Sequence, residues 1–84
     1  MKIWISDHAR GQMEIGKIPA EPVEMIANCP DRQYDNAPDE TVCQSKMPIG
    51  GKTYIVGVFV NFKKSPPAVI SVYRTSKIDK YWRD

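Results

Sequence analysis

The residues of this sequence that could move protons and hold a phosphate lie in the segment SDHARGQM, residues 6–13. The segment contains the only histidine of the chain, His8, and Arg10 follows two positions later. An imidazole exchanges protons near neutral pH, and a guanidinium can bind two phosphate oxygens at once. A lone histidine is, however, more often a surface or capping residue than a catalytic one. The segment therefore indicates either phosphate chemistry or a polar helix start.

Capping residues and hydrophobic spacing predict the elements around this segment. Residues 1–6 alternate Ile3 and Ile5 against Lys2 and Trp4, as a short strand with one face inward does. Ser6 or Asp7 can then cap a helix that begins near His8. Gly16 is predicted to end that helix.

The rest of the chain is predicted to form a second helix followed by strands. Residues 18–31 have helical spacing of apolar side chains, and Pro30 ends the pattern. Alternation then predicts strands over residues 31–35, 41–47, 52–62 and 68–75. Gly57 indicates a bulge or a close approach within the most apolar of them. The predicted fold class is α+β, with an N-terminal strand and two helices packed on one face of a three- to four-stranded antiparallel sheet.

The last predicted strand and the tail carry a second group of polar and aromatic residues. Strict alternation places Val69, Ser71, Tyr73 and Thr75 on one side of the strand, and Ile70, Val72 and Arg74 on the other. The tail SKIDKYW is predicted to form a short helix that covers a sheet edge with Tyr81 and Trp82. Stacking of these two rings on a nucleic-acid base is the alternative.

Length and composition predict one domain over residues 1–84. The chain has 84 residues, of which 42% are hydrophobic, and no stretch long enough for a linker. A chain of this size buries only about 60 to 65% of its unfolded surface, so we expect a partner or a homodimer to add stability. No segment approaches the roughly 20 apolar residues that cross a bilayer, and the N-terminal residues lack a secretory signal. A cytoplasmic location without membrane contact is therefore predicted.

The two cysteines, Cys29 and Cys43, are far apart in the sequence and form no CxxC spacing. Only one histidine is present to complete a metal site with them. Two reduced and partly buried thiols are expected, and a disulfide or a shared zinc is the less common alternative. We therefore predict no metal and no other cofactor.

The net charge of +2 hides a strong asymmetry along the chain. Residues 1–51 contain five Lys and Arg against eight Asp and Glu, a balance of −3. Residues 52–84 contain seven against two, a balance of +5. A basic half is a common feature of proteins that bind nucleic acid, because Lys and Arg displace counterions from phosphates. The same pattern also occurs as a merely solvated face.

Three segments, HARGQM, EPVEMIANCPDRQY and VISVYRTSKIDKYW, give the chain a family resemblance. Together they resemble a prokaryotic family of small uncharacterised proteins in the RelE-like class, within the wider barnase, EndoU, colicin and RelE group of nucleases. The resemblance covers nearly the whole chain in the order of its elements. It implies a metal-independent endoribonuclease, the toxin of a toxin–antitoxin pair, with a small antitoxin protein as its partner. The implied substrate is cellular RNA, including mRNA on the ribosome, cleaved by attack of a ribose 2′-hydroxyl on the adjacent phosphate.

The resemblance also implies roles for residues near both ends of the chain. The implied catalytic residues are His8, Arg10, Tyr73, Arg74 and Thr75. The implied RNA-binding residues are Gln12, Lys77, Lys80, Tyr81 and Trp82. His8 would transfer protons while cationic side chains hold the phosphate. These roles require that folding brings His8 and Arg74 into one cationic pocket.

Other observations favour a simpler function. His8 and Arg10 diverge by about 200° on an ideal helix, so one site uses both only at the helix end. Many members of the family carry an arginine further into the first helix, where this chain has Gln12, which cannot neutralise charge. Tyr73 could simply pack against the helices. The alternatives are a non-catalytic module of the same fold that binds RNA or protein, and a structural subunit whose partner completes its sheet.

Overall fold

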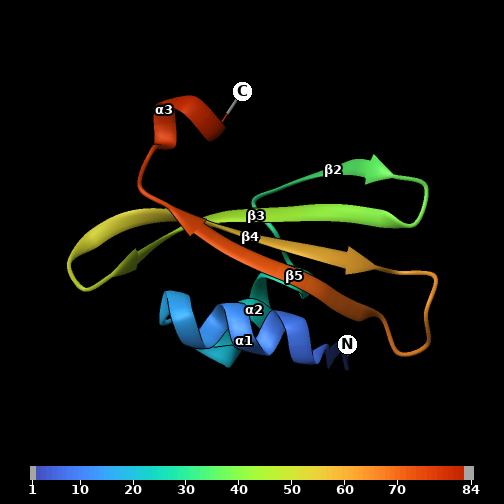
Figure 1. Ribbon diagram of the computed structural model, residues 1–84. Coiled ribbons are helices and arrows are strands. Elements are labelled where there is room, and N and C mark those ends of the chain that lie inside the picture. Colours follow the sequence, from blue (N-terminus) through green and yellow to red (C-terminus); the bar gives the residue numbers. More distant parts are fainter. Residues whose placement is uncertain (1, 83–84) are drawn as a thin grey trace.

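The computed structural model describes residues 2–82, which form one mixed β-sheet with helices on both faces. Helices α1 (Asp7–Gly16) and α2 (Ala20–Asn28) cover one face, and the single-turn helix α3 (Ile78–Tyr81) lies on the other side (Figure 1). The predicted α+β class is confirmed. No helix among the described residues is long and apolar enough to cross a membrane.

The sheet contains five strands in the order β1-β5-β4-β3-β2. Their bounds are Trp4–Ile5 for β1, Arg32–Ala37 for β2, Glu40–Ile49 for β3, Lys52–Asn61 for β4 and Ala68–Thr75 for β5. Strands β2 to β5 form an antiparallel meander, and β1 pairs in parallel with β5. The predicted sheet of three to four antiparallel strands is therefore wrong in one respect. The N-terminal strand, which was predicted to pack on the sheet, is its fifth strand and is parallel to β5.

The N-terminal strand joins the sheet because the outer edge of β5 would otherwise be unpaired. The amide of Trp4 donates to the carbonyl of Pro67 at 2.9 Å, and the amide of Ser6 donates to the carbonyl of Val69 at 3.0 Å. The Ser6 hydroxyl then caps α1 by accepting from the Ala9 amide at 3.1 Å. The capping residue predicted from the sequence is thus confirmed.

The hydrophobic core lies between the sheet and the layer formed by α1 and α2. Buried residues of the two helices are Ala9, Met13, Val23, Ile26 and Ala27. They meet a row of valines that includes Val56, Val58 and Val60 on β4. Burial of this apolar surface is the main stabilising contribution for a chain of this length.

Strand β5 does not alternate strictly, which makes one prediction about its faces wrong. Val69 and Val72 both belong to the core, although strict alternation places them on opposite sides. The register shifts between Phe59 and Val60, so β5 gains one residue against β4 at that point. Because of the extra residue, Val69 faces the side opposite to the one predicted for it. Residues after the bulge, from Val72 on, alternate as predicted. Tyr73 therefore still lies on the side opposite Val72.

Gly57 marks the close approach that its position in the sequence indicates. It pairs with Gln44 on one side and with Tyr73 on the other, so the three residues form a row across β3, β4 and β5. A Cβ at position 57 would overlap Cε1 and Cζ of Tyr73. The Tyr73 ring thus lies over Gly57, on the sheet face that α1 and α2 do not cover.

Candidate nucleic-acid interface on the open sheet face

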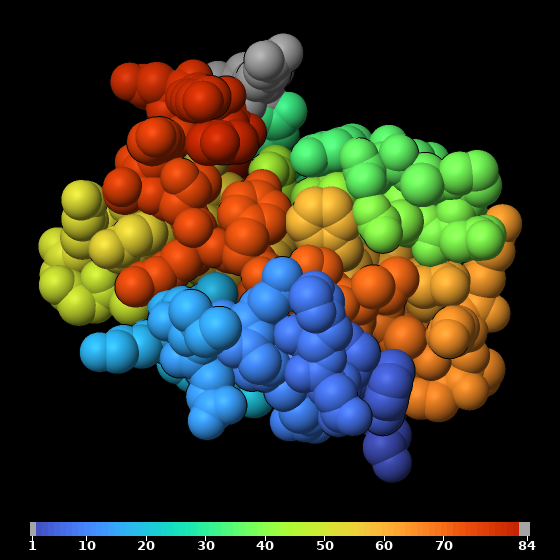
Figure 2. Space-filling model, viewed as in Figure 1, coloured from blue at the N-terminus to red at the C-terminus, as the bar shows by residue number. Residues whose placement is uncertain are grey.

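Aromatic and cationic side chains gather on the face of the sheet opposite α1 and α2, which we call the open face. Register and alternation place five of its residues as Arg32 and Tyr34 on β2, Gln44 on β3, Phe59 on β4 and Tyr73 on β5. Figure 2 shows part of this surface, with α3 (red) standing above β4 and β5 (orange), β2 (green) to one side and α1 (blue) below.

The open face contains two adjoining hollows that share the walls Tyr34 and Tyr81. The cationic hollow, of about 460 Å³, is lined by Arg32, Tyr34, Gln44, Lys80 and Tyr81. The aromatic hollow, of about 440 Å³, is lined by Tyr34, Phe59, Tyr73, Arg74, Thr75 and Tyr81. Tyr34 and Tyr81 are 48% and 45% exposed, so their rings are available to a ligand.

Arg32 is held by an aromatic ring, and one of its nitrogens has no acceptor in the described part of the chain. Its Cζ lies 5.1 Å from the ring centroid of Trp82, and Lys46 Nζ lies 4.6 Å from the same ring. Stacking against Trp82 uses the face of the guanidinium and leaves its N–H edge for other partners. Arg32 Nη1 is shielded from solvent and has no hydrogen-bond partner among residues 2–82. An unpaired enclosed donor is costly, so a ligand acceptor here would be favoured.

The Tyr73 hydroxyl is oriented by Gln44. Gln44 is 3% exposed, and its Nε2 donates to the Tyr73 hydroxyl at 2.7 Å. Burial raises the pKa of Tyr73, although the hydrogen bond from Gln44 acts in the opposite direction. The hydroxyl is therefore protonated at neutral pH, and its proton is free to be donated to a ligand. Phe59 fixes the ring with an edge contact of 5.9 Å between centroids.

Several residues implied by the resemblance do lie at this face. Tyr73 and Thr75 line the aromatic hollow, Lys80 lines the cationic hollow, and Tyr81 lines both. Trp82 stacks on Arg32. The exposed Lys77 stands before α3, and its amide donates to Thr75 Oγ1 at 3.1 Å. The predicted tail helix is present, but it lies over the open face rather than along a sheet edge (Figure 1).

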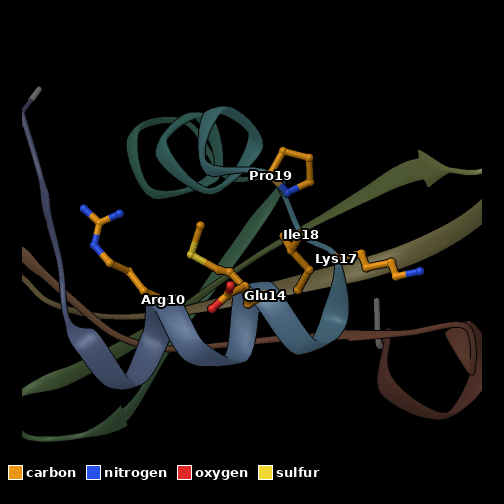
Figure 3. Close-up of a pocket in the computed structure, with 6 residues that line it drawn as sticks. Arg10, Glu14, Lys17, Ile18 and Pro19 are labelled. Atoms are coloured by element: carbon orange, nitrogen blue, oxygen red, sulfur yellow. The ribbon is translucent and has the colours of Figure 1, made fainter.

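The residues of α1 lie elsewhere. His8 is exposed in the first turn of α1, and we find no hydrogen bond or ion pair to its imidazole among residues 2–82. Gln12 Oε1 accepts from Ser71 Oγ and from the Val72 amide, both at 2.8 Å, so it joins α1 to β5. Arg10 lines a groove of about 520 Å³ along α1, where it and Lys17 point away from each other (Figure 3).

The structure does not bring His8 and Arg74 into one pocket. The start of α1 is fixed to β5 by the bond from the Ser6 hydroxyl to the Ile70 carbonyl, at 3.2 Å. Arg74 lies four residues further along the strand, about 13 Å at 3.3 Å per residue. It pairs with the core residue Val56, and its Cζ lies over the Tyr54 ring at 4.6 Å. The guanidinium is therefore turned away from Tyr73 as well.

Sequence reasoning missed five residues of this surface: Arg32, Tyr34, Gln44, Lys46 and Phe59. The alternation of side chains along a strand was a usable signal. It places Arg32 and Tyr34 on one face of β2, and it places Gln44 and Lys46 on one face of β3. Nothing in that period shows which strands are neighbours.

The cysteines and the acidic residues form no second site. Cys29 is exposed and Cys43 is buried, and both are free, so the expectation of partial burial is wrong for each. Burial raises the pKa of Cys43 to about 11. Within residues 2–82, no group of three His, Cys, Asp or Glu side chains is placed to hold a metal ion.

Comparisons with protein-family models, with curated proteins and with solved structures find no match for this chain. The geometry of the open face therefore has to indicate a function.

Proposed function

We propose that this protein is a RelE-like domain that binds single-stranded RNA across the open face. One observation carries the proposal: aromatic rings and cations share the sheet face that α1 and α2 leave uncovered, and within residues 2–82 no acidic side chain lines its two hollows. Rings of this kind stack on unpaired bases, while Arg and Lys bind the phosphates between them. The basic C-terminal half of the chain and the family resemblance support RNA as the ligand.

A single strand suits this surface better than a duplex. The hollows present ring faces and edges, which can contact bases only where those bases are unpaired and unstacked. No helix or β-ribbon of suitable size projects from the open face toward a groove, since α3 has four residues. Binding should therefore fall when the RNA is annealed to its complement.

Fluorescence anisotropy with a labelled 12-nucleotide RNA tests this function. The double variant Tyr34→Ala/Tyr81→Ala removes the two exposed rings and should weaken binding on the order of 10- to 100-fold, because stacking contributes about 1–3 kcal/mol per base. Trp4→Ala is the matched control, since Trp4 is 52% exposed but lies on β1. Affinity should also fall with salt, by about 0.7 in log K per log unit for each phosphate contacted. Equal affinities for all three proteins would overturn the proposal.

RNA cleavage at the same face is a second candidate, favoured by the Tyr73 hydroxyl beside the cationic hollow. In that reaction the ribose 2′-oxygen bonds to phosphorus and the bond to the 5′-oxygen breaks, giving a 2′,3′-cyclic phosphate and a 5′-hydroxyl. Arg32 and Lys80 would stabilise the oxyanions, and Tyr73 would donate its proton to the leaving oxygen. The proton of the attacking 2′-hydroxyl would pass to solvent water, and solvent would return a proton to Tyr73 after product release. A cytoplasmic toxin of this kind would need restraint by a small antitoxin, as the resemblance implies.

Product analysis separates cleavage from binding. Tyr73→Phe keeps the ring but removes the hydroxyl, so it should retain RNA binding and lose the cyclic phosphate product. His8→Ala should cleave normally, because His8 lies outside the open face. RNA with a 2′-deoxyribose at the cleaved position should stay intact. If the unaltered protein binds RNA but leaves it uncut, and its expression does not slow bacterial growth, the non-catalytic module is correct.

A further inference from the structure

We infer that the two hollows divide one nucleotide unit between them, with the base in the aromatic hollow and the adjoining phosphate in the cationic hollow. The inference depends on the proposed RNA binding and names the smallest ligand of the open face, a dinucleoside monophosphate. It also assigns the Tyr73 hydroxyl to the ribose that connects base and phosphate.

The cationic hollow has the chemistry of a phosphate site. Two of its five lining residues are cations, Arg32 and Lys80, and none is acidic. Trp82 holds the guanidinium by its face, and none of the described residues, 2–82, supplies an acceptor to Nη1. Phosphate oxygens supply acceptors that match the N–H edge of an arginine, and Lys80 adds a second charge.

The aromatic hollow has the chemistry of a base site. Phe59 and Tyr73 meet at an interplanar angle of 61°, which gives the hollow two ring surfaces in different orientations. Tyr34 and Tyr81 form its other walls, and no acidic residue lines it. The one cation, Arg74, has its guanidinium over Tyr54 instead. Planar bases bind such surfaces by stacking, with little dependence on charge.

A single hydrogen bond marks the boundary between the hollows. Gln44 lines the cationic hollow, Tyr73 lines the aromatic hollow, and the bond of 2.7 Å joins them. A ribose that places its base in one hollow and its phosphate in the other must cross this boundary. Because the Tyr73 hydroxyl accepts from Gln44, its proton can be donated to the ribose 2′-oxygen. That contact would let the site distinguish RNA from DNA.

Titrations followed by NMR chemical shifts, with three probes, test this division: UpU, uridine and inorganic phosphate. Arg32→Gln should weaken UpU and phosphate on the order of tenfold and leave uridine unchanged. Phe59→Leu should weaken UpU and uridine by a similar factor and leave phosphate unchanged. Tyr73→Phe should remove the preference for UpU over its 2′-deoxy analogue. Lys64→Gln and Phe62→Leu are the matched controls, since both residues are exposed near the loop that joins β4 to β5.

The outcomes separate this inference from the proposed function. If the 12-nucleotide RNA binds through Tyr34 and Tyr81 but each variant weakens all three probes equally, the division is wrong and RNA binding stands. The same holds if UpU and its deoxy analogue bind equally to the unaltered protein. If neither the 12-nucleotide RNA nor UpU binds, both proposals are overturned. The backbone amide spectrum of each variant checks that it remains folded.

Discussion

Tyr73 and Gly57 are an interdependent pair at the centre of the open face. The ring occupies the space that any side chain at position 57 would need. Gly57→Ala should therefore displace the ring, break its hydrogen bond with Gln44 and lower the free energy of unfolding by about 1–3 kcal/mol, as overpacking does. Urea denaturation measures the loss. RNA binding should weaken in the same variant, because the displaced Tyr73 ring lines the aromatic hollow.

Gly11 provides the control for this substitution. It lies within α1, and a Cβ there would meet no atom within 4 Å. Gly11→Ala should raise the free energy of unfolding by roughly 0.5–1 kcal/mol, since alanine is the better helix former. If Gly57→Ala were as stable as the unaltered protein, the ring could not be packed over that glycine.

Because the thiol of Cys43 is buried, the free energy of unfolding should decrease at alkaline pH. Its pKa is raised from 9.0 to about 11 by burial, so the unfolded chain loses this proton at a lower pH than the folded chain. The stabilisation is intact below about pH 9 and is lost as pH rises through about 11. Tyr73, whose pKa is also raised, acts with the same sign.

Urea midpoints measured from pH 8 to pH 11, in the range set by the Cys43 pKa, test this expectation. The midpoint should fall, and Cys43→Ala should show a shallower fall than the unaltered protein. Cys29→Ala is the control, because that thiol is exposed and should leave the slope unchanged. Parallel curves for all three proteins would show that Cys43 titrates alike in both states.

Among the elements, α1 and β5 are joined midway along the helix by the side chain of Gln12. Gln12 satisfies the Val72 amide, which β1 is too short to reach, and also the Ser71 hydroxyl. Gln12→Ala should lower the free energy of unfolding by about 1–3 kcal/mol, because a backbone donor is left unpaired. Gln12→Glu keeps the acceptor oxygens and should be much less destabilised.

Thermal or urea unfolding of the two Gln12 variants distinguishes this structural role from RNA binding. The prediction of an RNA contact for Gln12 requires that Gln12→Ala binds RNA less well even where it is fully folded. A structural role requires unchanged affinity under those conditions. Since Gln12 lies on α1 and the hollows lie across the sheet, we expect unchanged affinity.

At the level of elements, local signals were sufficient for most of the fold. The Ser6 cap and the helical spacing over residues 18–31 predicted the two helices. The glycine pair Gly50–Gly51, between two of the predicted strands, is a local signal of the same kind for the hairpin of β3 and β4. The glycines do take positive φ, 59° and 81°. The partner of β1 could not be predicted, because it depends on pairing between segments more than 60 positions apart. The bulge in β5 could not be predicted either, because it depends on the register of β5 against β4, which alternation alone does not give.

For the molecule as a whole, the candidate site is built from residues of four strands and the tail. The sequence alone does not indicate that these segments lie side by side. Tyr73, Thr75 and the tail residues were identified because they are adjacent in the chain. Arg32 and Gln44 were missed because only the register of β2, β3 and β4 brings them beside Tyr73. His8 and Arg74 were grouped by type, and the length of β5 separates them.

The tail should be separable from the rest of the molecule. No residue of α3 is buried, so removal of residues 77–84 should lower the free energy of unfolding by less than about 3 kcal/mol. The same truncation removes Lys80 from the cationic hollow and Tyr81 from both hollows, and it should abolish measurable binding of the 12-nucleotide RNA. Circular dichroism and anisotropy on the same sample measure both effects. A truncated protein that binds RNA at full strength would show that the tail is not part of the interface.

The two ends of the described chain leave the molecule on opposite sides of the sheet (Figure 1). The first strand emerges beside α1, whereas Trp82 ends the described residues next to Arg32. An affinity tag, dye or surface tether on the amino end should therefore leave the interface accessible. The same attachment on the carboxyl end would crowd the cationic hollow. Protein immobilised through its carboxyl end should therefore bind less RNA than protein immobilised through its amino end.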